Sequence, residues 1–265
     1  ADYHAGNLSK RYPAIAVLGI NQAFGLLFGL TLAITSHAWS AEAYGLHGYL
    51  LPGILAGFSG YFGLICLYAG LSTGRMGVVS PISSLSVLIP LAYALIYKGD
   101  HLTPVLSIGV VLATCGGILA SGPELSQGFS LKPVLMAVGA ACGFGVALTF
   151  MALGSESSPL MTMTTMRSST LLISLGIALR YKSLGGVKKQ SLPLLAGIGI
   201  ADFSANLLLG LATTKGLVSL AMVLGALYPI ATALLAFKFL HERLHKIQYL
   251  GVALAIAGVA IISAF

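Results

Sequence analysis

The stretch FLHERLHKIQYLGVALAIAG, residues 239–258, sets one acid and several basic residues directly before an apolar run. A similar stretch, YKGDHLTPVLSIGVVLATCG, lies 142 positions earlier at residues 97–116. Overlaying the two aligns Asp100 with Glu242, Gly109 with Gly251 and Gly116 with Gly258. A match of this length within one chain indicates that the sequence contains two copies of one unit.

The composition is that of a membrane protein. Of the 265 residues, 57% are hydrophobic and 8% are charged, whereas soluble domains carry about 25% charged residues. Uninterrupted apolar stretches of roughly 20 residues favour membrane-spanning helices over the alternating strands of a barrel. We expect nine helical spans, at residues 13–36, 48–71, 76–98, 104–121, 131–153, 159–181, 192–213, 216–240 and 246–265.

The repeat predicts how these spans are organised. GLSTGRMGVVS at residues 70–80 resembles GLATTKGLVSL at residues 210–220, so the similarity extends beyond the opening pair of stretches. The second copy holds five spans, and an odd number of spans forces its copy to enter the membrane in the opposite sense. We therefore expect an all-α membrane protein of two inverted five-helix repeats, residues 1–121 and 131–265. Residues 1–9 would then be the tail of a truncated first helix in a ten-helix pattern.

The repeated motif resembles that of a known family. An acid, a short basic linker and a helix with Gly-x6-Gly, present in two copies, are similar to the EamA family of the drug/metabolite transporter superfamily. SLAMVLGALYPIATALLAFKFLHERL, residues 219–244, resembles the ninth helix of that family. The chain departs from the pattern at Asp100, where Glu is usual, and at His241, where Gly is usual. The resemblance implies a multi-pass transporter of the inner membrane that exports amino acids or related metabolites by alternating access.

Charged groups inside spans are the first functional candidates, because burying them in hydrocarbon costs at least about 2.5 kcal/mol each. Arg167 and Asp202 stand out, and Asn206 lies one turn beyond Asp202 on the same helical face. Asp202 and Asn206 could present an acceptor and an amide to a solute or a proton. The alternative is that Asp202 pairs with Arg167 as a structural ion pair between two helices. Asp2 is a third candidate, in the truncated first helix.

The resemblance also implies a central cavity for the solute. Mapped onto this chain, its lining comprises Phe58, Tyr61, Ser83, Phe144, Asp202, Asn206 and Tyr228. Such aromatic and amide side chains suit a small zwitterion or an aromatic solute. The sequence does not choose between these, and it leaves proton coupling open.

Other classes of protein are less consistent with the sequence. The net charge of +7 is spread over short loops, which is typical of membrane proteins and not of a nucleic-acid partner. His241, Glu242 and His245 lack a third convincing ligand, so we predict no metal site and no cofactor. GIGIAD at residues 197–202 partly resembles an intramembrane aspartyl protease motif, but its acid is displaced, and we expect no enzyme. A membrane sensor or scaffold remains the second alternative.

The basic residues predict an orientation. Alternating loops place eleven of them on or near one face, with only Lys98 and Lys215 on the other. The positive-inside rule makes the first face cytoplasmic and leaves the C-terminus outside.

Overall fold

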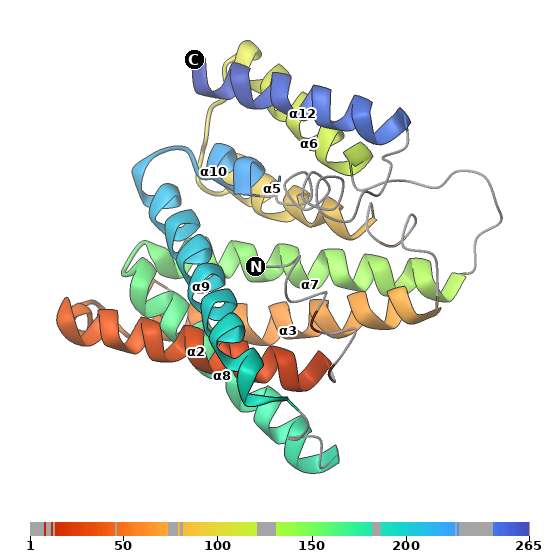
Figure 1. The fold of residues 1–265 in the computed structure, drawn as a ribbon. Coiled ribbons are helices and arrows are strands. Elements are labelled where there is room, and N and C mark those ends of the chain that lie inside the picture. The colour runs from red at the N-terminus through yellow and green to blue at the C-terminus, as the bar shows by residue number, and fades with distance from the viewer. Residues whose placement is uncertain are drawn as a thin grey trace. The chain divides into compact units, whose positions relative to one another are not determined.

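The computed structural model describes a chain that is helical throughout its regular parts. The described residues are 8, 12, 14–45, 47–73, 79, 82–120, 131–181, 187–225, 227 and 246–264. Their α-helices, shown in Figure 1, are α2 (Ala14–Thr35), α3 (Leu50–Thr73), α5 (Leu88–Ile96), α6 (Pro104–Ala120), α7 (Leu131–Ser155), α8 (Pro159–Tyr181), α9 (Leu192–Lys215), α10 (Val218–Gly225) and α12 (Lys246–Ala264). Short 3-10 turns lie at Ala38–Ser40, Leu85–Val87 and Lys189–Ser191.

Each predicted span coincides with one of these helices, which confirms the all-α class. Helices α5 and α10 cover parts of the spans at 76–98 and 216–240, and the remainder of both lies partly outside the described residues. In the described part of the chain, four helical segments are long and apolar enough to cross a membrane: Ala16–Thr35, Leu50–Leu67, Leu131–Ser155 and Lys189–Lys215. Helix α8 is as long, but its many Ser and Thr residues make it less apolar.

The chain forms two compact units, each built from separated parts of the sequence. The first unit comprises Ala1–Phe58 and Phe150–Thr214, and the second comprises Ser59–Thr149 and Lys215–Phe265. Both units combine segments from both predicted repeats. The repeats at 1–121 and 131–265 therefore stay a prediction about sequence and symmetry, distinct from these spatial units.

In the first unit, α8 packs closely against α2 and the start of α3. Glycines make this approach possible: a Cβ at Gly29 of α2 would lie 2.9 Å from Oγ1 of Thr164, and one at Gly57 of α3 would lie 2.7 Å from Cβ of Ser169. Several α8 hydroxyls donate to carbonyls of the preceding turn, as Thr164 does to Leu160 at 2.8 Å. The small side chains of α8 let it pack between two apolar helices.

In the second unit, α6 and α12 run side by side, as Figure 1 shows. A Cβ at Gly116 would lie 2.7 Å from the carbonyl oxygen of Gly251, and one at Gly258 would lie 2.7 Å from that of Gly109. The N-terminal part of each helix thus meets the C-terminal part of the other, so the two helices are antiparallel. The four glycines of the repeated motif form one shared interface in which the backbones touch.

The acid of the first motif also has a structural role in this unit. Oδ2 of Asp100 accepts hydrogen bonds from the backbone N–H of Ser219 at 2.8 Å and from its hydroxyl at 2.7 Å. Ser219 lies in the first turn of α10, whose N–H groups have no partner within the helix. A carboxylate there is favoured by the positive end of the helix dipole. Asp100 therefore caps a helix that lies 119 residues further along the chain.

The glycine interface yields a test of helix packing. Gly116→Ala places a methyl group against the backbone of α12, and overpacking of this kind costs about 1 to 3 kcal/mol. Gly197→Ala in α9 is the matched control, because a Cβ there meets nothing within 4 Å in the described structure. We expect Gly116→Ala to lower the detergent melting temperature and Gly197→Ala to leave it unchanged or raised. Equal melting temperatures for both variants would contradict the close approach.

Candidate functional site

The first unit contains a buried ion pair between α8 and α9. Nη2 of Arg167 lies 2.6 Å from Oδ2 of Asp202. The Arg167 side chain is 5% exposed and that of Asp202 is 29% exposed. Nη2 has no aligned hydrogen bond to a described residue, so this contact is held by charge and proximity. The structure therefore contains the ion pair that the sequence offered as one of two interpretations of Asp202.

Helix α2 supplies the other partner of the guanidinium. Nη1 of Arg167 donates to Oε1 of Gln22 at 2.9 Å, and the same oxygen accepts from the hydroxyl of Thr170 at 3.2 Å. Gln22 is buried. One amide oxygen thus receives two hydrogen bonds from α8, and the guanidinium is held between a neutral acceptor and a negative one. Arg167 connects three helices through these contacts.

Close backbone contact between α2 and α9 brings these acceptors to the same side chain. A Cβ at Gly25 of α2 would lie 3.0 Å from the carbonyl oxygen of Gly199 in α9. Gln22 precedes Gly25 by about one turn, and Asp202 follows Gly199 by about one turn. Next to this crossing, Phe28 and Phe203 pack edge to face with ring centroids 5.8 Å apart. Because neither glycine has a side chain, α2 and α9 can both reach Arg167.

The cluster lies near the middle of each helix. Gln22, Arg167 and Asp202 follow the first residues of α2, α8 and α9 by eight, eight and ten positions. At 1.5 Å per residue this is about 12 to 15 Å along each helix, and the hydrocarbon core of a bilayer is about 30 Å thick. The charged pair of α8 and α9, together with Gln22 of α2, therefore lies close to the middle of these helices.

Asn206 lies on the same face of α9 as Asp202, as the spacing predicts. Its Nδ2 donates to the backbone carbonyl of Asp202 at 2.8 Å and lies 3.4 Å from Oδ1 of the same residue. The shorter bond fixes the amide against the helix. The longer one is weak, so Oδ1 of Asp202 keeps most of its capacity as an acceptor.

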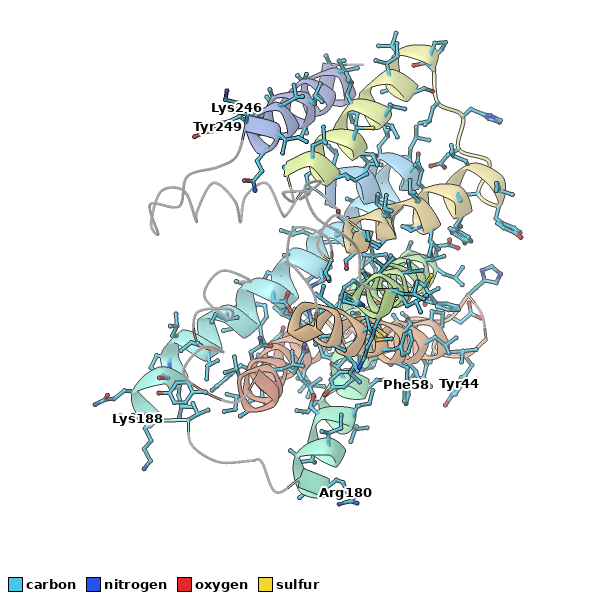
Figure 2. The ribbon with its side chains drawn as sticks, turned by 90° about the vertical axis from the view of Figure 1, so that its right-hand side faces the viewer. Tyr44, Phe58, Arg180, Lys188, Lys246 and Tyr249 are labelled. Carbon is cyan, nitrogen blue, oxygen red and sulfur yellow. The ribbon has the colours of Figure 1, made fainter. Side chains whose placement is uncertain are left out.

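The other predicted lining residues belong to different surroundings. Phe58, labelled in Figure 2, is 56% exposed on α3 at the end of the first unit. Tyr61, Ser83 and Phe144 belong to the second unit. Tyr61 and Ser83 are buried, and the Ser83 hydroxyl donates to the carbonyl of Val79 at 2.8 Å. A Cβ at Gly63 would meet the ring of Phe144, so this ring packs against α3. Among the described residues of the first unit, the structure brings together Arg167, Asp202 and Asn206.

Several candidates from the sequence lie outside the described residues. These are Tyr228, Asp2, His241, Glu242 and His245. Within the part of the chain that the structure describes, no three His, Cys, Asp or Glu side chains come close enough to hold a metal ion.

Sequence reasoning missed Gln22 and Thr170. Neither residue was a candidate, because the first candidates inside the spans were ionisable groups and these two side chains carry no charge. The signal was present, because Asn21 and Gln22 are adjacent amides in the otherwise apolar stretch AIAVLGINQAFG. An amide inside a span needs a partner for the same reason that a charge does.

The chain is similar to known proteins. The family model described as "EamA-like transporter family" matches residues 131–264. A solved structure titled "Crystal structure of protein" is similar to the chain with 16% sequence identity and a TM-score of 0.75, covering 99% of this chain and 92% of that one. At this identity the likeness concerns the fold alone. No curated protein matches the sequence.

The ion pair can be tested by a double-mutant cycle. Asp202→Asn leaves the buried guanidinium without its counter-charge, and breaking a buried pair in this way typically costs about 3 to 5 kcal/mol. We expect a marked loss of melting temperature in detergent. Arg167→Gln combined with Asp202→Asn removes both charges and should recover most of that loss.

Glu42→Gln is the control for this cycle, because it removes an exposed loop acid and should leave the melting temperature unchanged. An Asp202→Asn protein as stable as the wild type would show that the pair contributes nothing to the fold. An additive loss in the double variant would show that the two side chains do not interact.

Proposed function

The chain belongs to the EamA-like transporter family, and from that premise we propose that it moves small polar solutes across a membrane by alternating access. It is a multi-pass membrane protein with several helices apolar enough to span a bilayer. The proposed site centres on Asp202 and Asn206, with Arg167 as the charge that holds Asp202 in place. Phe58, Tyr61, Ser83, Phe144 and Tyr228 stay proposed lining residues on the strength of the resemblance.

The observation that carries this proposal is a charged pair at mid-depth whose acid is partly exposed. Removing both partners of an ion pair from water is costly, and in this pair only the guanidinium is nearly completely buried. Charged residues inside spans usually face a water-filled cavity or the interior of a bundle. Solute and coupling-ion sites of secondary transporters lie near the bilayer midplane. Asp202 lies near the middle of its helix and is partly exposed, which supports the proposal.

The pairing of α6 with α12 supports the inverted repeat that alternating access would use. The sequence overlay makes Gly109 equivalent to Gly251 and Gly116 to Gly258. The contacts join Gly109 to Gly258 and Gly116 to Gly251 across antiparallel helices. A two-fold axis exchanges equivalent residues in this crosswise manner. We propose that such an axis lies in the membrane plane and relates residues 1–121 to residues 131–265.

The proposal extends to the substrate class, the direction of transport and the membrane. We propose an inner-membrane exporter of amino acids or related metabolites, because the resemblance implies that substrate class, direction and compartment. Asp202 also offers a carboxylate through which a proton could be coupled to transport. A non-transporting sensor or scaffold, or an intramembrane enzyme, would need neither a solute path nor flux.

A flux assay tests the proposal. The protein is reconstituted into proteoliposomes and screened with radiolabelled polar metabolites. We expect flux that requires Asp202, so Arg167→Gln with Asp202→Asn should abolish it while remaining folded, as judged by its melting temperature. Glu42→Gln should retain wild-type flux. Wild-type flux in the folded double variant would remove the pair from the transport mechanism, and no flux for any solute would favour a sensor or scaffold.

The orientation predicted from the basic residues has its own test. A reporter fused after Phe265 should be active on the outer face of the membrane. A single cysteine at Lys188, in a background without Cys66, Cys115 and Cys142, should resist an impermeant reagent added from outside. Lys188 is exposed in the structure, as Figure 2 shows, so burial would not explain protection. A cytoplasmic reporter would contradict the charge bias.

A further inference from the structure

The Arg167–Asp202 pair presents its two charges unequally. The guanidinium is 5% exposed, whereas the carboxylate is 29% exposed. The described donors of Arg167 are directed to partners on two helices, Nη1 to Gln22 and Nη2 to Asp202. A solute that reaches the pair therefore meets the carboxylate first.

The exposed part of Asp202 can accept further hydrogen bonds. A carboxylate has about four lone-pair positions on two oxygens. Arg167 engages Oδ2, and Asn206 approaches Oδ1 only at 3.4 Å. A donor could therefore bind Oδ1 while the ion pair stays intact. Charged side chains at this depth usually face the interior of a bundle or a water-filled cavity and not hydrocarbon.

Resting on the proposed function, we infer that this site takes solutes through a protonated amino group, which donates to Oδ1 of Asp202. An ammonium group has three donors and a positive charge, so it complements the partly exposed carboxylate of the pair. A solute carboxylate would be repelled by Asp202 and would have to break the ion pair to reach the buried guanidinium. A neutral hydroxyl would gain a hydrogen bond without the charge attraction.

A metal cation fits the Asp202 carboxylate less well than an ammonium group does. Calcium takes six to eight oxygen ligands and magnesium about six. Within the described residues, no cluster of three acids, histidines or cysteines surrounds Asp202. One carboxylate beside the amide of Asn206 suits a single ammonium group, which carries its own donors and needs no ligand cage.

Two matched series of solutes test the inference. The aliphatic series is alanine, alaninol and lactate, and the aromatic series is phenylalanine, phenylalaninol and phenyllactate. In each series the amino alcohol keeps the ammonium group and loses the carboxylate, while the hydroxy acid keeps the carboxylate and loses the ammonium group. Using both series separates recognition of the head group from recognition of the side chain.

The readouts are the melting temperature of the full chain in detergent and the flux of labelled solutes into proteoliposomes. In at least one series, we expect the amino acid and the amino alcohol to raise the melting temperature and to move about tenfold faster than the hydroxy acid, because a site that bonds an N–H group rejects the analogue without it. Both effects should disappear in Arg167→Gln with Asp202→Asn and persist in Glu42→Gln.

Preferred flux of the hydroxy acids, or an amine effect that persists in the folded double variant, would overturn the inference while leaving transport itself standing. Flux of protons through Asp202 without selection for amines would overturn it as well. Absence of flux for both series and for the wider metabolite screen would overturn the proposed function and this inference together.

Discussion

A guanidinium within a membrane-spanning bundle must have its charge neutralised. Arg167 meets this requirement through Asp202 on α9 and Gln22 on α2, and both contacts require the backbones of those helices to come close. The close crossing at Gly25 and Gly199 provides that approach. The arrangement of α2, α8 and α9 therefore depends on one buried charge, and so does the position of the partly exposed Asp202 carboxylate.

The second unit is organised by different interactions. Its helices α6 and α12 meet through glycines, and Asp100 caps α10 from the loop before α6. The acid and the glycines of the first motif thus join elements that come from opposite halves of the sequence. The proposed two-fold axis accounts for the two copies of the motif, because equivalent helices that contact each other across such an axis each supply half of the same interface.

Much of the fold could be predicted from the sequence because apolar stretches of span length have few alternatives in a membrane. The helices α2, α3 and α8 begin and end within a few residues of the expected positions. The site was less predictable. The pairing of Arg167 with Asp202 was one of two interpretations, because charge identifies the need for a partner and not which partner satisfies it. Gln22 was missed since an uncharged amide gives a weaker signal. The exposure of Asp202 and burial of Arg167 depend on packing, which helical periodicity alone does not determine.

The central claim is that the carboxylate face of α9 borders a water-filled solute path. The most direct measurement places a cysteine at Asn206, half-buried beside Asp202, in a chain whose native cysteines are replaced. The account predicts that a water-soluble thiol reagent labels this cysteine and that a transported amine slows the labelling. A cysteine that remains unreactive in the folded protein, with or without solute, would contradict it.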